Sequence, residues 1–245
     1  MSQPPFRSAF VLGSTSAVAE AIVRALAQRG CRRFHLVARR PEANEGLVAE
    51  LRQQGAEVSQ ASTDLLADAS LELAARPQLP QSFDLYLITA GSLGDAERAR
   101  NDATEALRIT AANYSGLLPW ITAIATPERL QRPGSLWIFS SVAADRGRPS
   151  NYHYGAAKAA LTTLAEGLLL RCQGGPFAVR VIKAGFMATP MTVGKAPAAL
   201  CAAPASVARD LLRRPHRRGI HYLPWFWRPL MAVVRRLPPA LARKL

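Results

Sequence analysis

Apolar runs of strand length alternate with helix-length segments along almost the whole chain. The expected strands are Phe6–Leu12, Phe34–Ala38, Val58–Ser62, Asp84–Ile88, Ser135–Ser140, Val179–Lys183 and Gly219–Leu223. The expected helices are Ser16–Gln28, Glu42–Gln54, Ala69–Ala75, Ala103–Ala125 and Tyr152–Cys172. Strands that alternate with helices in this way form parallel units in which each helix crosses back over the sheet. The pattern therefore predicts an α/β protein with a doubly wound parallel sheet of about seven strands.

A length of 245 residues suits one α/β domain with a large core. Because no repeat or linker is present, residues 1–245 are predicted to form a single domain that ends in a basic, aromatic tail over about 220–245. The segment Gly185–Ala208 is rich in Ala and Pro, which favours a mobile substrate lid with one or two short helices. The uncharged stretch Ala111–Pro127 is predicted to be a buried helix.

The net charge is +14, from 31 Lys and Arg against 17 Asp and Glu, and much of it lies near the carboxyl terminus. Nine basic residues and no acidic residue follow Leu211. Such a segment can indicate nucleic-acid binding, but the aromatic residues within His221–Trp227 favour an anionic membrane surface over nucleic acid. Two alternatives stay open. The arginines could be an ordinary charged surface, or the aromatic residues could pack in a homo-oligomer interface.

The sequence lacks several features that would indicate a membrane-spanning or secreted protein. No window of about 18 apolar residues exists, so no transmembrane helix is expected. Residues 1–7 lead into the first strand without the apolar region of a secretory signal. Cys31, Cys172 and Cys201 form no C-x-x-C motif, and the four His have no ligand-like spacing, so reduced thiols and no metal site are expected. We expect a cytoplasmic protein that associates peripherally with the inner membrane.

Tyr154 and Lys158 are four residues apart on one predicted helix, so their side chains share a face. A fixed ammonium nearby favours the phenolate and lowers the pKa of the phenol toward the working pH. The pair would then be a tuned proton donor. Upstream, Ser141 follows the apolar run that ends at Phe139, and its hydroxyl could hydrogen-bond a substrate carbonyl. The combination predicts acid–base chemistry on a carbonyl group.

Together with a glycine turn after the first strand, these motifs resemble the short-chain dehydrogenase/reductase family over about residues 6–225. The resemblance implies a Rossmann-type fold and an NAD(P)-dependent oxidoreductase acting on CH–OH and C=O groups. More narrowly, Ala90–Glu97, Asn113–Tyr114, Ser140–Lys158 and the basic end of the chain are similar to the reductase subunits of decaprenylphosphoryl-ribose 2′-epimerase systems. That branch implies reduction of a keto sugar on a polyprenyl phosphate, giving the arabinose epimer after a flavin-dependent oxidase has oxidised the ribose.

The resemblance also implies a coenzyme site. Its residues would be Gly13, Ser14, Thr15, Ser16, Ala17, Val18, Arg39, Asp64, Ala90, Gly91, Tyr154, Lys158, Gly185, Met187 and Thr189. Of the family's three glycines only Gly13 is kept, and Ala17 and Ala19 occupy the other two positions. Since Arg39 rather than an acidic residue ends the second strand, NADP(H) is favoured, with NAD(H) as the alternative. Asp64 would contact the adenine or cap the next helix.

The catalytic residues that the resemblance implies are Asn113, Ser141, Tyr154 and Lys158. Tyr154 would protonate the carbonyl oxygen that Ser141 orients. Lys158 would lower the pKa of Tyr154 and hold the nicotinamide ribose. Asn113 would place a water molecule, or would merely satisfy a kinked backbone near Pro119. Met187 and Thr189 would hold the carboxamide of the coenzyme.

Arg146 and Arg148 lie between Ser141 and Tyr154, near the expected substrate mouth. Arginine suits bidentate phosphate binding, so one of the two would hold the prenyl phosphate, and the alternative is surface charge. Asp95 and Glu97 would hydrogen-bond sugar hydroxyls or cap a helix. Two other functions stay open, a generic ketone or 3-oxoacyl reductase and a non-catalytic dinucleotide-binding adaptor.

Overall fold

The computed structural model describes residues 4–68, 79–189, 192 and 197–243. Its centre is a seven-stranded sheet in the order β3-β2-β1-β4-β5-β6-β7, in which every neighbouring pair is parallel. The strands are β1 (Ser8–Leu12), β2 (Arg33–Ala38), β3 (Glu57–Ser62), β4 (Leu85–Ile88), β5 (Gly134–Ser141), β6 (Phe177–Ala184) and β7 (Gly219–Leu223). The doubly wound, Rossmann-type α/β fold expected from the sequence is confirmed.

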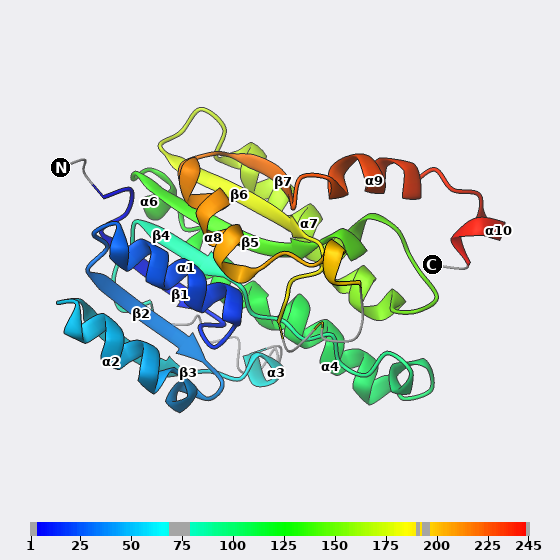
Figure 1. Cartoon of the computed structure of the whole chain (residues 1–245), viewed down its shortest axis with the longest axis horizontal. Helices are drawn as coiled ribbons and strands as arrows, with labels where there is room; N and C mark the ends of the chain where they lie inside the picture. Colours follow the sequence, from blue (N-terminus) through cyan, green and yellow to red (C-terminus); the bar gives the residue numbers. More distant parts are fainter. Residues whose placement is uncertain (1–3, 69–78, 190–191, 193–196, 244–245) are drawn as a thin grey trace.

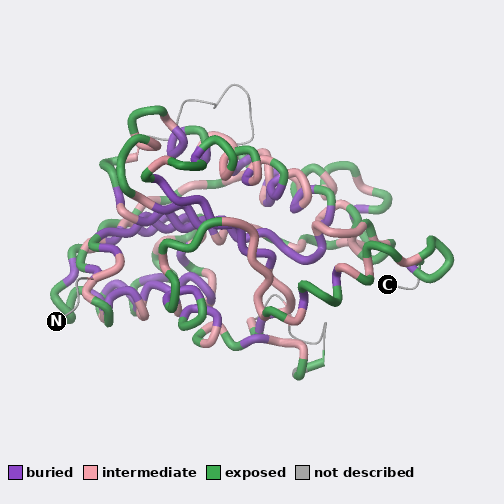
Figure 2. Tube along the Cα trace, turned by 90° about the horizontal axis from the view of Figure 1, so that it is seen from above, coloured by how far each residue is buried: buried purple, intermediate pink, exposed green. Residues whose placement is uncertain are grey.

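Helices cover both faces of the sheet, giving three layers (Figure 1). One face carries α1 (Ala17–Gln28), α2 (Glu45–Gln53) and α8 (Pro204–Arg213), and the other carries α4 (Ala103–Asn113), α5 (Leu118–Ile124) and α7 (Tyr152–Arg171). Each interface has its own apolar cluster, so the strands run between two cores. Figure 2 shows the buried strands at the centre and exposed helix surfaces around them.

Burial explains why these segments become strands and helices. All five residues of β1 are buried, as expected for a central parallel strand covered on both faces. In α1 the residues Val18, Ile22 and Leu26 recur every four positions and form the face that packs on the sheet. The edge strand β3 is polar and largely exposed, which suits its place at the border of the sheet.

The long helix expected over Ala103–Ala125 is wrong, because the structure divides it. After α4 the backbone leaves the helical region at Tyr114 (φ −146°, ψ −73°), a short 3-10 turn η3 follows at Ser115–Leu117, and α5 begins at Leu118. Pro119 has no N–H to donate and its ring excludes a helical carbonyl four residues earlier, so it is tolerated only near a helix start. Gly116 also packs directly against the carbonyl of Leu65, where a side chain would not fit.

Smaller differences concern element ends. The helix expected from Glu42 starts as the 3-10 turn η1 (Pro41–Asn44) before α2. The helix expected at Ala69–Ala75 lies outside the described residues, as does part of the proposed lid, whose described part contains η5 (Ala198–Leu200) and the start of α8. The remaining short elements are α3 (Leu65–Asp68), η2 (Arg98–Arg100), α6 (Pro127–Leu130), η4 (Val142–Asp145), α9 (Trp227–Val234) and α10 (Pro239–Ala242).

The tail after β7 extends beyond the carboxyl edge of the sheet as α9 and α10 (Figure 1). Two buried residues of α9, Trp227 and Met231, form a third apolar cluster with Val142 of η4. Within the described residues, none of the helices has both the length and the apolar character needed to cross a bilayer.

Candidate active site

The strand order reverses between β1 and β4, and in doubly wound sheets ligands bind beyond the carboxyl ends of the strands at such a point. Here the loops after β1 and β4 touch. Gly13 has φ +88°, and a Cβ added to it would lie 2.6 Å from Ala90 Cα. Only glycine combines this left-handed backbone with so close an approach. Thr89 donates its hydroxyl to the carbonyls of Leu12 and Gly13 and ties the loops together.

The four expected catalytic residues come from three elements and meet beside these loops. Ser141 is the last residue of β5, Asn113 the last of α4, and Tyr154 and Lys158 lie on successive turns of α7. The Lys158 Nζ is 5.9 Å from the centre of the Tyr154 ring, and Tyr154 is hydrogen-bonded to Ser141. The sheet and two helices therefore bring a hydroxyl, a phenol and an amine together at the carboxyl edge.

Asn113 is fully buried and its side chain is occupied by the protein. Its amide nitrogen donates to the carbonyls of Ser92 (2.6 Å) and Ile109 (2.8 Å), and its Oδ1 accepts from the Ser92 N–H (3.2 Å). A Cβ on Gly91 would lie 2.6 Å from that Oδ1 and 3.1 Å from Lys158 Nζ. Asn113 therefore fixes the loop after β4 against Lys158, and its hydrogen bonds with described residues go to Ser92 and Ile109 rather than to the backbone near Pro119.

The pKa directions differ from the expectation. Lys158 is buried, donates to the Phe139 carbonyl (3.2 Å), and has its pKa lowered to about 8 by desolvation. Burial raises the pKa of Tyr154, against the opposing effects of the Ser141 hydrogen bond and the charge of Arg148. The expected lowering of the Tyr154 pKa by Lys158 is wrong, because burial penalises the phenolate and the ammonium alike. The phenol consequently stays protonated at neutral pH, the state that a proton donor needs.

Ser14 is among the residues expected to contact the coenzyme, and here the expectation fails. The residue is fully buried, its backbone N–H donates to the Val37 carbonyl (3.1 Å), and its hydroxyl donates to the same carbonyl (3.2 Å). The hydroxyl also accepts from the Asn44 amide (2.7 Å). Ser14 therefore holds the turn against β2 and the start of α2 and has no group left for a phosphate.

The start of α1 has the form of an anion site. Thr15 is exposed, and Ser16 is the N-cap residue but makes no side-chain cap hydrogen bond with any described residue. The first N–H groups of a helix have no intrahelical acceptor, so those of Ala17 and Val18 can receive phosphate oxygens. At the end of β2, Arg39 and the next residue Arg40 are exposed. Asp64 accepts the Leu66 N–H (3.0 Å). This contact is the one expected if Asp64 caps the next helix.

The loop after β6 carries Gly185, Met187 and Thr189. The Gly185 N–H donates to the Leu223 carbonyl (2.9 Å), and the Trp227 indole lies directly against Gly185 where a Cβ would stand. Met187 is buried and its carbonyl accepts from the Thr189 N–H (2.8 Å). The tail helix therefore supports the loop on which the carboxamide contacts were expected.

The structure separates the two candidate phosphate ligands. Arg146 donates to the carbonyls of Arg235 (3.2 Å) and Leu237 (3.3 Å), so its guanidinium holds the end of α9. Arg148 is partly buried with its charge close to Tyr154, and its Nε is buried without a hydrogen-bond partner among the described residues. Arg148 is thus the one of the pair that faces the reacting groups.

A buried polar triad near the site was missed by the sequence analysis. Lys183 Nζ lies 2.5 Å from Asp145 Oδ1, and the Tyr222 hydroxyl donates to Asp145 Oδ2 (2.8 Å). Burial and the adjacent carboxylate raise the pKa of Tyr222 to about 12. The only sequence signals were a lysine inside an apolar strand and an acid four residues after Ser141. The triad joins η4 to β6 and β7.

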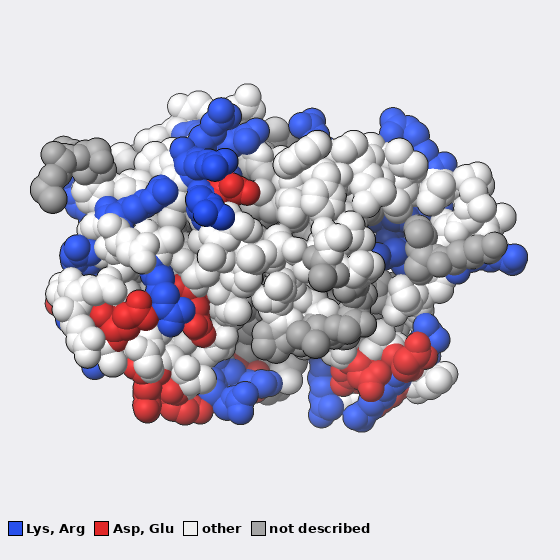
Figure 3. All heavy atoms as spheres, viewed as in Figure 1, with Lys and Arg blue, Asp and Glu red and all other residues white. Residues whose placement is uncertain are grey.

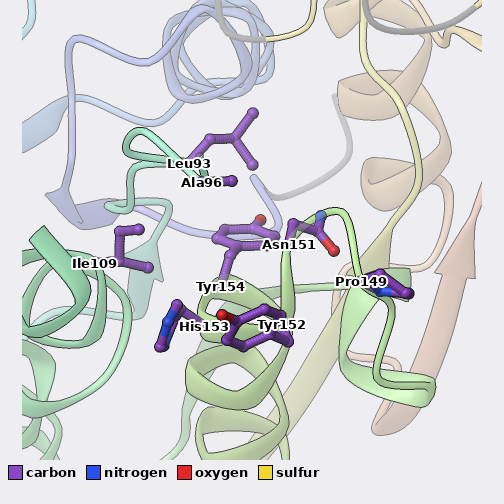
Figure 4. Close-up of a pocket in the computed structure, with 8 residues that line it drawn as sticks. All are labelled: Leu93, Ala96, Ile109, Pro149, Asn151, Tyr152, His153 and Tyr154. Atoms are coloured by element: carbon purple, nitrogen blue, oxygen red, sulfur yellow. The ribbon is translucent and has the colours of Figure 1, made fainter. Parts of the chain in front are cut away.

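A shallow depression adjoins Tyr154 and is formed by the loop after β4, α4 and the start of α7. Figure 4 shows its lining residues Leu93, Ala96, Ile109, Pro149, Asn151, Tyr152, His153 and Tyr154. Nearby, Asp95 accepts the Arg98 N–H (3.0 Å) and Glu97 pairs with Arg100 (2.8 Å). The Asp95 contact matches the helix-capping alternative, whereas Glu97 forms an ion pair and no cap hydrogen bond with any described residue.

Comparison with known proteins places this geometry in a family. The family model described as short chain dehydrogenase matches residues 7–199. The chain belongs to the short-chain dehydrogenase family. Membership confirms the expected class of enzyme, an NAD(P)-dependent oxidoreductase.

Two relatives and one solved structure illustrate the likeness. An uncharacterized oxidoreductase of Streptomyces coelicolor is 34% identical over 100% of this chain and 97% of its own length. A 3-oxoacyl-[acyl-carrier-protein] reductase of Chlamydia trachomatis is 24% identical over 76% of each chain. A short-chain dehydrogenase from Burkholderia cenocepacia, crystallised with NADP, has a TM-score of 0.79 at 20% identity and covers 98% of this chain and 97% of its own. At this identity the structural likeness shows the fold.

Proposed function

We propose that this short-chain dehydrogenase is an NADP(H)-dependent reductase of a keto sugar carried on a polyprenyl phosphate, of the type that converts decaprenylphosphoryl-2-keto-erythro-pentofuranose to decaprenylphosphoryl-arabinose. The observation that carries the reductase part is the Tyr154 phenol, hydrogen-bonded to Ser141 beside buried Lys158. The substrate class is supported by the resemblance of Ser140–Lys158 and by the cation of Arg148 next to Tyr154.

The residues present fit a dinucleotide. The Gly13 turn leaves no room for a side chain, and the uncapped start of α1 offers N–H groups for the pyrophosphate. Arg39, with Arg40 beside it, favours the 2′-phosphate of NADP(H) over the ribose diol that an acid would bind. Structural neighbours from Burkholderia cenocepacia and Sphingobium yanoikuyae were crystallised with NADP and NADPH, and one from Brucella melitensis with NAD, so NAD(H) stays the alternative.

When bound, the reduced coenzyme supplies the hydride that the carbonyl carbon accepts. Ser141 donates a hydrogen bond that orients the carbonyl oxygen. The Tyr154 phenol gives its proton to that oxygen, so the carbonyl becomes a hydroxyl and the phenolate is left. The Lys158 ammonium beside the ring stabilises this phenolate, and proton return from solvent resets the site.

Arg148 would bind the substrate's phosphate. Its guanidinium is partly desolvated, and its Nε has no hydrogen-bond partner among the described residues. Its positive charge lies close enough to Tyr154 to interact electrostatically with the phenol. A phosphate there would satisfy the donor and place the sugar carbonyl near the phenol. The substrate would come from a flavin-dependent oxidase that oxidises the matching hydroxyl group, with both enzymes working at the inner membrane.

A generic 3-oxoacyl reductase is the second candidate, because relatives from Chlamydia and a solved Brucella melitensis structure carry that activity in their names. The test is to incubate the protein with NADPH or NADH and either a polyprenylphosphoryl 2-keto-pentose or a 3-oxoacyl thioester. We expect nicotinamide oxidation and an arabinose product with the keto sugar and NADPH. Faster turnover of the thioester would overturn the assignment in favour of the second candidate.

A further inference from the structure

The tail exposes apolar side chains in one short stretch. Trp225 is 77% exposed, Leu230 41%, Val233 62% and Leu241 53%. These four are half of the eight exposed large hydrophobic side chains among the described residues. Single exposed apolar residues are ordinary, but a cluster in one segment marks an interaction site. We call these residues, with the exposed Arg228, Arg235, Arg236 and Arg243 between them, the tail surface.

The other side of α9 is already used. Trp227, Met231 and Val234 are spaced as one helix face and pack with Val142 and Phe186. Arg146 holds the carbonyls at the end of the helix, and Trp227 covers Gly185. The orientation of α9 is therefore fixed by the two loops that flank the active site, and its tail surface must face outward.

The charge of the tail surface selects an anionic partner. The chain has no Asp or Glu after Asp210, so none of the tail arginines has an acidic neighbour in sequence. In Figure 3 the described surface over α9 and α10 shows basic but no acidic atoms. Tryptophan and arginine side by side suit the interface of a bilayer, where the ring lies at headgroup depth and the cation meets lipid phosphate.

We propose that the tail surface docks on a bilayer containing anionic phospholipid, with α9 lying in the interfacial plane. Because its inner face contacts the Ser141–Tyr154 loop and the Gly185 loop, docking would hold the active-site mouth against the lipid surface. A polyprenyl phosphate presents its headgroup at that depth. The delivery of a polyprenyl phosphate to the active site rests on the proposed function, whereas the contact between the tail surface and the bilayer does not.

The test is cosedimentation of the full chain with vesicles of phosphatidylcholine alone or of phosphatidylcholine with one third phosphatidylglycerol. We expect binding to the anionic vesicles that weakens as salt is raised. The double variant Trp225→Ser/Val233→Ser should bind at least roughly tenfold more weakly, and Arg228→Gln roughly fivefold more weakly. The matched control Leu170→Ser removes a residue of α7 that is 68% exposed and should bind as the wild type does.

Failure of wild-type binding to anionic vesicles would overturn the docking proposal. If light scattering then showed a dimer that Trp225→Ser/Val233→Ser converts to a monomer, the tail surface would be an interface between two copies. Vesicle binding without keto-sugar turnover would leave docking in place and remove the substrate assignment. Turnover of a short-chain, water-soluble keto-sugar phosphate should survive in the double variant, while turnover of vesicle-embedded substrate should fall with binding.

Discussion

Lys158 is buried, Tyr154 and Arg148 are partly buried, and neither cation forms an ion pair with an acidic side chain in the described part of the chain. Lys158 donates to the Phe139 carbonyl, the Arg148 Nε has no hydrogen-bond partner among the described residues, and both cations lie near Tyr154. Burial therefore lowers the pKa of Lys158 and raises that of Tyr154, so that protonated phenol is the resting state. Desolvating these cations costs stability, and an anionic ligand would give the Arg148 Nε the acceptor that it lacks.

The first prediction concerns Lys158→Met, which we expect to abolish turnover and to stabilise the fold at pH 7. Burial lowers the Lys158 pKa from its ordinary value of 10.5 to about 8. Between these values the unfolded chain binds more protons than the folded one, so wild-type stability rises with pH across that window. At pH 7 the variant should be more stable by roughly 1–3 kcal/mol, and the gain should shrink by pH 10. Urea unfolding at both pH values measures this, and a less stable variant at pH 7 would contradict it.

The second prediction compares two glycines with left-handed backbone. Gly13→Ala should lose on the order of 2–4 kcal/mol and weaken NADPH binding, because the new Cβ would collide with Ala90. Gly55 has φ +78° but no heavy atom within 4 Å among the described residues, so Gly55→Ala should cost only about 1 kcal/mol and leave NADPH binding unchanged. Urea unfolding and nicotinamide fluorescence measure the two effects. Equal losses in both variants would show that the contact with Ala90 is unimportant.

The third prediction separates the neighbouring arginines of the active-site loop. Arg148→Ala should raise KM for a phosphate-bearing ketone about 10- to 100-fold, since a charge-assisted pair is lost, and should leave KM for an uncharged ketone unchanged. Arg146→Ala should instead speed amide exchange in α9, whose terminal carbonyls it holds. Steady-state kinetics and hydrogen exchange measure the pair. If Arg146→Ala raised KM for the phosphate-bearing ketone and Arg148→Ala sped amide exchange in α9, the assigned roles of the two arginines would be refuted.

At the scale of elements, the turn η4 is fastened on several sides. Asp145 joins it to β6 through Lys183 and to β7 through Tyr222, and Arg146 joins it to α9. Ser141 lies at its start and Arg148 just beyond its end. The loop that presents catalytic groups is therefore held to the sheet rather than left to move.

The fourth prediction tests this attachment. Asp145→Asn leaves the buried Lys183 ammonium without its counter-ion and should lower the free energy of unfolding by roughly 3–5 kcal/mol. Tyr222→Phe removes one hydrogen bond from the same carboxylate and should cost only about 1–2 kcal/mol. Urea unfolding of both variants measures these losses. Equally small losses in the free energy of unfolding would show that the Lys183–Asp145 ion pair contributes little to stability.

What the sequence could predict depended on local pattern. All seven strands were located to within about two residues, and the buried ones were marked by continuous apolar runs. The division of the helix at Tyr114 was missed because Pro119 was expected at most to kink one long helix, not to mark the start of a second one. Ser14 was misassigned because a serine in a phosphate loop can equally donate inward, and only the Val37 carbonyl, 23 residues away, decides. The Asp145 triad joins residues 38 and 77 positions apart, which no local pattern reveals.

At the scale of the whole molecule, the Gly13 turn, the group formed by Ser141, Tyr154 and Lys158, and the basic tail all lie at the carboxyl edge of one sheet (Figure 1). The sheet is rigid because both of its faces are covered by packed helices. The tail adds an exposed basic and apolar surface next to the loops that carry Ser141 and Met187. Reaction chemistry and the proposed lipid contact would thus share one side of the molecule.

All of this depends on Tyr154 as the proton donor, which Tyr154→Phe tests. The variant removes only the hydroxyl, so NADPH binding measured by fluorescence should stay close to that of the wild type. Hydride transfer to the ketone, followed by nicotinamide absorbance in a single turnover, should fall roughly 10²- to 10⁴-fold. A variant that binds NADPH and reduces the ketone at the wild-type rate would contradict the account.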